Sequence, residues 1–388
     1  MSGAAHVTAR FRALDGWRGI CALLVAAHHI EARGLLYWQP LIRNAWLFVD
    51  FFFVLSGFVI AHAYGDALAT RPQVGSFAIR RLGRLWPLHA AMLAALIGLE
   101  LLHLGIAHWH PIAGERAAFT ADRSPYTILT NLLLIQSLGL HPYETWNGPA
   151  WSISTEFYTY LVFAAVCFAA SGRRLRVVLS FLIAAVGVFV LARFSRYGMR
   201  ETFDWGFFRC LYGFFTGVLT YEIWRRGGAK APKGSICEVL AVIAVIAFLT
   251  IVPGNRAAEF LATPLFALAV LVFAGEGGIL SRVLTLRPAQ ALGRWSYSIY
   301  MVHTLVLAAL FSAIHSAEFA FHRTWLVHTP DGNAILALGW GNDPVMIAIL
   351  AGVIALAAFT WRHVERPGQR LFNRLAAPRA VEMATQNL

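Results

Sequence analysis

The sequence predicts an all-α polytopic membrane protein with about ten transmembrane helices. Of the 388 residues, 58% are apolar and only 13% are charged, and the mean hydropathy is +0.61. Soluble domains are roughly 45–50% apolar and about 25% charged. One soluble core cannot bury such an excess of apolar residues, which excludes a disordered chain, a fibrous repeat and a soluble nucleic-acid-binding domain.

Ten apolar runs have the length of a membrane-spanning helix, because about 20 apolar residues cross a bilayer. An eleventh run, 127–140, is short and precedes a loop with proline and glycine. We expect this run to be an interfacial or re-entrant part of the outer loop 107–150. We predict one transmembrane domain over 1–388, with a core of about 10–370 and a tail at 371–388. The predicted spans are 16–34, 46–64, 87–106, 151–171, 177–194, 207–224, 236–252, 259–274, 296–315 and 344–363.

The formal net charge of +12 is distributed unevenly among the predicted loops. With ten spans and a cytoplasmic N-terminus, 22 lysines and arginines lie inside and 9 outside, as the positive-inside rule requires. Counting 127–140 as a span gives 12 inside and 19 outside. We therefore predict that both termini are cytoplasmic. The basic charge indicates membrane orientation, and no nucleic-acid partner is expected.

The cysteines show no pattern of a metal site or a disulfide framework, because no two of them are close in sequence. We expect them to pack among the helices as small apolar residues, and no metal site is predicted. The four cysteines are Cys21, Cys167, Cys210 and Cys237.

The first span carries an arginine and a histidine at membrane depth. Arg18 and His29 are eleven residues apart, which is about three helical turns, so both side chains point from one face. Their axial separation is about 16 Å. We expect Arg18 near the cytoplasmic surface and His29 beyond the midplane, with His28 rotated off that face. Buried ionisable residues are expensive in a membrane and usually functional, although a hydrogen-bonded core histidine is the alternative.

Two carboxylates are predicted at the depth of His29. Asp50 lies about one turn into the second span, and Glu156 lies at the start of the fourth, four residues after Ser152 and close to Trp151. A carboxylate beside an imidazole raises its basicity and fixes its tautomer. The alternative is an interhelical hydrogen-bond network that only stabilises the bundle.

A basic run precedes the third span. Arg81 and Arg84 share one helical face, with Arg80 beside them, and guanidinium groups match phosphate oxygens. A topological anchor or a contact with anionic lipid explains the pattern equally well.

The ninth span carries Ser296, Tyr300 and His303 on one face, which predicts a polar track from the cytoplasmic side. After the last span, Glu365 and Pro367 indicate a helix stop at the cytoplasmic surface.

Taken together, these motifs resemble the acyltransferase family 3 membrane proteins. The matching features occur in the family's order over residues 10–370: the arginine and histidine of the first span, Phe51 to Phe58, Arg81 with Arg84, Trp151 to Glu156, Ser296 to His303, and Glu365 with Pro367. The resemblance implies a bacterial inner-membrane enzyme that moves an acyl group, often acetyl, from acyl-CoA to a hydroxyl. The family's usual acceptors are cell-surface or secreted carbohydrates.

The resemblance assigns roles to particular residues. It implies that His29 and Arg18 are essential and that Arg81 and Arg84 contact the donor, and we add Arg80 to this group. We hypothesise that His29 is the general base, oriented by Glu156 in preference to Asp50. Trp151, Ser152, Tyr300 and His303 are candidate substrate contacts.

Two readings from other classes remain open at this point. A transporter or flippase of a lipid-linked saccharide also places ionisable residues at depth. A lipid-carrier glycosyltransferase is the third possibility, but the sequence has no convincing acidic cluster for a divalent metal.

Overall fold

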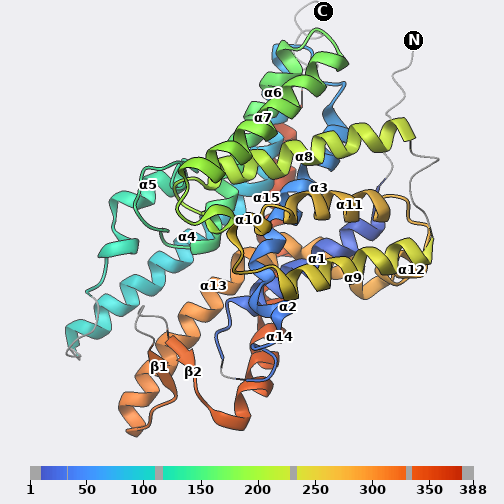
Figure 1. The fold of residues 1–388 in the computed structure, drawn as a ribbon. Helices are drawn as coiled ribbons and strands as arrows, with labels where there is room; N and C mark the ends of the chain where they lie inside the picture. Colours follow the sequence, from blue (N-terminus) through green and yellow to red (C-terminus); the bar gives the residue numbers. More distant parts are fainter. Residues whose placement is uncertain (1–9, 33, 110–116, 228–233, 329–333, 378–388) are drawn as a thin grey trace, which may run out of the picture.

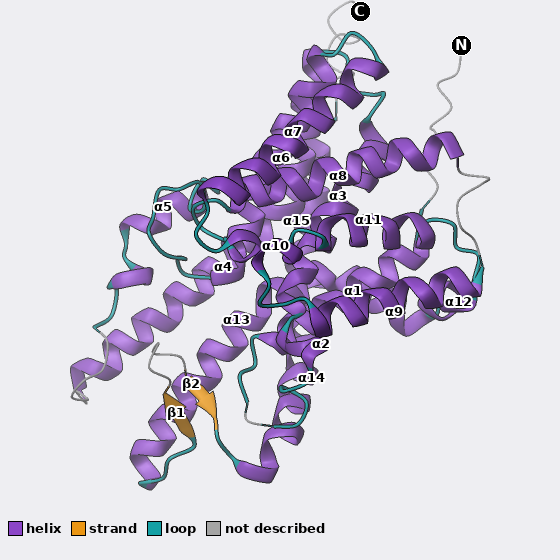
Figure 2. Ribbon diagram, in the orientation of Figure 1, coloured by secondary structure: helices purple, strands orange, loops and turns teal. Residues whose placement is uncertain are grey.

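The computed structural model describes residues 10–32, 34–109, 117–227, 234–328 and 334–377. Almost all of them are helical, as Figure 2 shows, and one small two-stranded sheet accompanies the helices. The helices are α1 Arg12–His28, α2 Pro40–Arg43, α3 Phe48–Tyr64, α4 Arg71–Trp109, α5 Tyr126–Leu132, α6 Trp151–Ala169, α7 Arg173–Phe194, α8 Gly206–Gly227, α9 Ser235–Ile251, α10 Arg256–Glu259, α11 Ala262–Phe273, α12 Ile279–Leu284, α13 Arg287–Phe321, α14 Asn342–Thr360 and α15 Arg366–Leu375.

Each of the ten predicted spans coincides with a helix (Figure 1). Within the described ranges, seven helical stretches are long and apolar enough to cross a membrane: those of α3, α4, α6, α7, α11, α13 and α14. Helices α1 and α9 have 17 residues each, and α8 carries Arg209 in its interior and two arginines in its last turn. The predicted class, an all-α polytopic membrane protein, is confirmed.

The run 127–140 does not form a spanning helix. Only α5 is helical there, and it has 7 residues. The chain then folds back against the start of α6, where Ser154 donates a hydrogen bond to the carbonyl of Leu134 at 2.6 Å and accepts one from the backbone N–H of Ser137 at 3.3 Å. The segment therefore supports the N-terminal end of α6.

Helices α1 and α13, which correspond to the first and the ninth predicted span, pack against each other. A Cβ atom on Gly19 would lie 2.5 Å from the backbone nitrogen of Gly293, and one on Gly293 would lie 2.3 Å from the carbonyl oxygen of Asp15. No side chain fits at such distances, so the two backbones touch. This contact aligns the polar face of α13 with the Arg18 and His29 face of α1.

The predicted helix stop after the last span is wrong. A π-helical turn, Trp361–Glu365, continues α14 into α15. Pro367 falls in the first turn of α15, directly after the π-helical turn, and proline has no backbone N–H to donate to the preceding turn. Helix α15 packs on α4, and a Cβ on Gly83 would lie 2.2 Å from the side chain of Phe372. Residues 371–375 of the predicted tail are thus helical, and 378–388 lie outside the described residues.

Loop ends that the charge count places on the same side pack together. Asp66, after α3, pairs with Arg176 of α7 at 2.5 Å and with Arg225 of α8 at 2.7 Å. The hydrogen bond from Arg176 is the main cause that lowers the pKa of this carboxyl. At the other end of α1 and α13 lies the small sheet, in which β1 Leu326–His328 pairs antiparallel with β2 Ala334–Leu336. The backbone N–H of Leu336 donates a hydrogen bond to the backbone carbonyl of Glu31, which follows α1.

Candidate active site

Three of the four predicted donor arginines line one cavity. This arginine cavity has about 830 Å³ of empty space, which includes space open to solvent. Arg80 does not line it. The lining residues come from α1, α3, α4, α6 and α13, and include Arg18, Val49, Phe52, Phe53, Leu55, Ser56, Arg81, Arg84, Ser152, Glu156, Tyr160, Ser296 and Tyr300.

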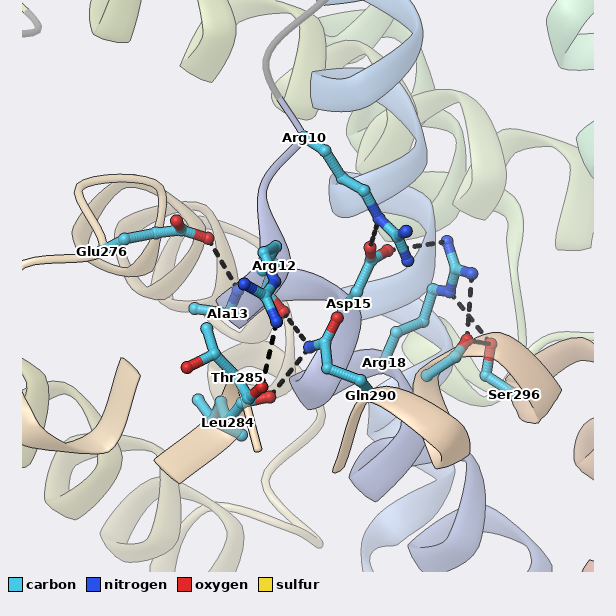
Figure 3. A network of polar contacts seen from close by, with 11 residues as sticks. Arg10, Arg12, Ala13, Asp15, Arg18, Glu276, Leu284, Thr285, Gln290 and Ser296 are labelled. Carbon is cyan, nitrogen blue, oxygen red and sulfur yellow. Dashed lines mark hydrogen bonds and ion pairs between the residues drawn. The ribbon is translucent and has the colours of Figure 1, made fainter. Parts of the chain in front are cut away.

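Arg18 is held between α1 and α13 (Figure 3). Its Nε donates to Ser296 Oγ at 2.9 Å, and a terminal nitrogen donates to the carbonyl of Gly293 at 3.2 Å. Asp15 lies 3.8 Å away but also binds Arg10 at 2.6 Å. The guanidinium is therefore oriented mainly by neutral acceptors, so little of its positive charge is cancelled.

Arg84 has a carboxylate partner that the sequence did not indicate. It pairs with Glu365, whose side chain is only 1% exposed. Ser298 also donates to this carboxylate at 2.7 Å, and Gln369 donates at 3.2 Å. The π-helical turn places Glu365 in this position, and no local pattern in the sequence predicted that turn. Glu365 thus binds α4, α13 and α15 together.

Arg81 has no carboxylate partner among the described residues. Its guanidinium lies over the rings of Tyr64, Phe77 and Tyr160 at 5.4, 5.9 and 5.8 Å. Such cation–π contacts orient the group without neutralising its charge. Arg81 is therefore the arginine of this cavity that is best suited to bind an anionic ligand.

The predicted contact between Glu156 and His29 is absent in the described structure. Glu156 lies on the arginine cavity, where it accepts hydrogen bonds from Ser56 and Tyr160, each at 2.6 Å. The Glu156 carboxylate instead faces Ser56 of α3 and Tyr160 of its own helix.

His29 lines a second cavity, of about 760 Å³. Its Nδ1 lies 2.8 Å from the carbonyl oxygen of Val25. Because a carbonyl can only accept, Nδ1 carries the hydrogen and Nε2 keeps a lone pair. A backbone carbonyl of the same helix therefore fixes the tautomer. This histidine cavity is lined by Val25, His28, His29, Arg43, Trp46, Val49, Glu144, Pro149, Trp151, Arg200, Thr202, Arg209 and Tyr300.

Asp50 does not orient His29 either. Both of its oxygens accept hydrogen bonds from Arg209, at 3.0 and 2.8 Å, and the side chains are 0% and 2% exposed. Arg209 in turn lies over the rings of Trp46 and Trp151 at 5.5 and 5.1 Å. The prediction that Asp50 partners His29 is therefore wrong. Asp50 of α3 forms a buried ion pair with Arg209 of α8, and Arg209 lines the histidine cavity.

His303 lies behind His29 and lines neither cavity. The two ring centroids are 4.8 Å apart, and Nδ1 of His303 donates to the carbonyl of Ile299 at 3.3 Å. Its Nε2 is buried and has no hydrogen-bond partner among the residues that the structure describes. The predicted direct contact with substrate does not fit this burial, so His303 supports the ring of His29 instead.

The two cavities lie next to each other at Val49 and Tyr300, which line both, and we call this place the junction. The Tyr300 hydroxyl lies 2.9 Å from Ser152 Oγ and 2.9 Å from the carbonyl oxygen of Pro149. Ser152 lies on the arginine cavity and Trp151 on the histidine cavity. The predicted polar track on α13 therefore runs from Ser296 to this junction and ends beside His29.

Five polar residues of the histidine cavity were not predicted from the sequence: Arg43, Glu144, Arg200, Thr202 and Arg209. Burial raises the pKa of the Glu144 carboxyl, and a hydrogen bond from Thr202 acts in the opposite direction. Arg43 and Arg200 belong to the few basic residues predicted outside. Because the positive-inside rule disfavours arginine there, their location was the one sequence feature that could have marked them as functional.

The helical fold and the two neighbouring cavities define an integral multi-pass membrane protein in which a histidine, His29, is exposed to a polar cavity. Residues 11–362 match the family described as acyltransferase domain, and the chain belongs to this family. It is therefore an acyl-transferring enzyme, as the motifs indicated.

Two relatives support this assignment. Acyltransferase MdmB of Streptomyces mycarofaciens is 26% identical over 399 aligned positions, which cover 94% of this chain and 93% of the relative. Protein 2 in picA locus of Rhizobium radiobacter is 31% identical over 163 positions, covering 40% of this chain and 81% of the relative. No solved structure matches the chain.

Proposed function

We propose that the protein is an O-acyltransferase of the bacterial inner membrane that moves an acyl group, acetyl in the first instance, from cytoplasmic acyl-CoA to a hydroxyl of a surface or exported carbohydrate. The observation that carries this proposal is the junction of the two cavities. A basic cavity, in which Arg81 has no carboxylate partner among the described residues, lies next to a polar cavity in which the Val25 carbonyl holds His29 Nδ1 and leaves Nε2 as the proton acceptor.

The arginine cavity suits the donor. Acyl-CoA carries phosphates, which bind guanidinium groups such as those of Arg81 and Arg18. Its acyl-bearing arm is narrow and uncharged, and it matches the apolar wall formed by Phe52, Phe53 and Leu55 on α3. The thioester would then lie at the junction.

The histidine cavity suits a polyhydroxylated acceptor. Its wall combines two tryptophans with arginine, glutamate and threonine side chains, which can hydrogen-bond to several hydroxyls at once. A sugar hydroxyl is a poor nucleophile at neutral pH, and a positioned general base contributes about 10²–10⁴-fold to the rate. In this step His29 Nε2 takes the hydroxyl proton, the ester C–O bond forms, the C–S bond breaks, and the proton passes to the departing sulfur of CoA.

The function is tested by comparing surface and secreted glycans of cells that contain the protein, lack it, or contain His29→Ala. Mass spectrometry should find O-acyl groups only with the wild-type protein. Membranes supplied with radiolabelled acetyl-CoA should yield an alkali-labile label on the same saccharide. Translocation of a lipid-linked saccharide without acyl transfer would contradict the proposal and favour a flippase.

Arg81→Ala is expected to raise the Kd for acetyl-CoA by about 10–100-fold, because a hydrogen bond to a charged group contributes about 1.5–3 kcal/mol. Isothermal titration calorimetry of the purified protein in nanodiscs measures the Kd for acetyl-CoA. Arg80→Ala is the matched comparison, since Arg80 lies outside the cavity, and its Kd should change less than about twofold. Equal effects of both variants would show that the donor does not occupy the arginine cavity.

Val49→Phe is expected to lower transfer more than tenfold while the Kd for acetyl-CoA stays unchanged. The added ring fills the junction, and overpacking itself destabilises by about 1–3 kcal/mol. Val49→Ala, at the same position, should retain transfer. Initial rates of both variants test whether the acyl group passes the junction. A wild-type rate in Val49→Phe would show that the acyl group takes another route.

A further inference from the structure

We propose that the Tyr300 hydroxyl donates a hydrogen bond to the acyl carbonyl oxygen and stabilises the oxyanion of the transfer step, with Ser152 as its positioning partner. This inference rests on the proposed function and names a further catalytic group for it.

The first argument is location. Among the described residues, only Val49 and Tyr300 line both cavities. The Val49 side chain is apolar, so Tyr300 supplies the polar group at the junction. A thioester that enters from the arginine cavity must present its carbonyl here if a hydroxyl on the His29 side is to attack it.

The second argument counts protons. Tyr300, Ser152 and the Pro149 carbonyl form a triangle with oxygen–oxygen distances of 2.9, 3.0 and 2.9 Å. The two hydroxyls supply two protons for these three contacts, because a carbonyl only accepts. Ser152 can therefore satisfy Pro149 alone while Tyr300 turns its proton toward a ligand. Because Tyr300 has one proton, this exchange replaces one hydrogen bond within the protein by one to the ligand.

The third argument is preorganisation. Tyr300 is 6% exposed, and its ring packs against Phe52 at 6.2 Å and His303 at 6.0 Å. His303 also packs on His29, so one buried ring holds both the proposed base and the proposed donor. The ring is therefore held in place and only the hydroxyl proton has to turn, and a donor fixed next to a developing charge supplies a large part of catalysis.

The chemical step is balanced as follows. The acceptor oxygen attacks the thioester carbon and its proton moves to His29 Nε2. The carbonyl electron pair moves onto the carbonyl oxygen, which accepts the hydrogen bond from Tyr300. When the C–O double bond re-forms, the C–S bond breaks, and the sulfur leaves with the proton from His29. Tyr300 keeps its own proton throughout.

Tyr300→Phe tests the proposal, because it removes one oxygen and retains the ring that packs on His303. We expect kcat to fall by about 10²–10³-fold, as for other oxyanion donors, with the Kd for acetyl-CoA unchanged. Tyr212→Phe is the matched control, since its hydroxyl binds the Phe260 carbonyl at 3.0 Å and it lines neither cavity. Its kcat should stay within about threefold of wild type. Ser152→Ala should lower kcat by about tenfold through loss of positioning.

A Tyr300→Phe protein with near-wild-type kcat would overturn the assignment, and so would a loss confined to donor affinity. In both cases the proposed function stands, because wild-type transfer is measured in the same preparation. Wild-type protein without acetyl-CoA-dependent transfer would instead overturn the proposed function, and the role of Tyr300 with it.

Discussion

Replacing His29 with alanine is expected to lower acyl transfer by about 10²–10⁴-fold, the contribution of a general base, with acyl-CoA binding and membrane insertion unchanged. The ring lies in the wall of the histidine cavity and does not line the arginine cavity. Its loss therefore removes the proton acceptor and leaves the donor contacts in place. Initial rates and the Kd for acetyl-CoA, measured on purified protein in nanodiscs, separate these effects.

His28→Ala provides the comparison for His29→Ala. His28 lines the same cavity, but its Nδ1 binds the Ile42 carbonyl at 3.2 Å and its ring points off the Arg18 face. We expect a loss of tenfold or less. Added imidazole should partly restore transfer to His29→Ala, since the vacated space opens into a cavity of about 760 Å³. Substantial residual transfer in His29→Ala would show that another group takes the proton.

Replacing Asp50 with alanine is expected to destabilise the protein by about 3–5 kcal/mol, because it leaves Arg209 buried without its partner. Both side chains are nearly inaccessible, and the two charges meet through two hydrogen bonds. The measurement is the thermal unfolding midpoint in detergent, together with the yield of monodisperse protein.

The double variant Asp50→Leu with Arg209→Met distinguishes a structural from a catalytic carboxylate. Apolar residues of similar volume often replace a buried ion pair without loss of stability, so we expect the double variant to fold. An Asp50→Ala protein of wild-type stability that has lost only transfer would contradict the structural role and return Asp50 to the catalytic group.

Much of the fold could be predicted from the sequence. Hydropathy locates all seven described helical stretches that are long and apolar enough to cross a membrane, because the bilayer requires about 20 apolar residues in a row. The charge count correctly excluded 127–140 as a span. The spacing of Arg18 and His29 on one helix, and of Ser296 and Tyr300 on another, correctly predicted shared faces, because both follow from the helical repeat alone.

The partners across helices could not be predicted in the same way. The helical repeat gives the position of Asp50 and of Glu156 along its own helix, but not which neighbouring helix each side chain faces. Asp50 faces Arg209 of α8 and Glu156 faces Ser56 of α3, so neither reaches His29. Glu365 shows a second limit, because a π-helical turn has no sequence signature and it redirects every later side chain.

The backbone contact between Gly19 and Gly293 sets the scale of the whole site. Arg18 and His29 belong to α1, and Ser296 and Tyr300 belong to α13, so the two touching main chains hold these side chains in a fixed register. Along α1, Arg18 and His29 are about 16 Å apart. Under the proposed function, we expect this fixed separation to select carrier thiols by the length of their arm, independently of the acyl group they bear.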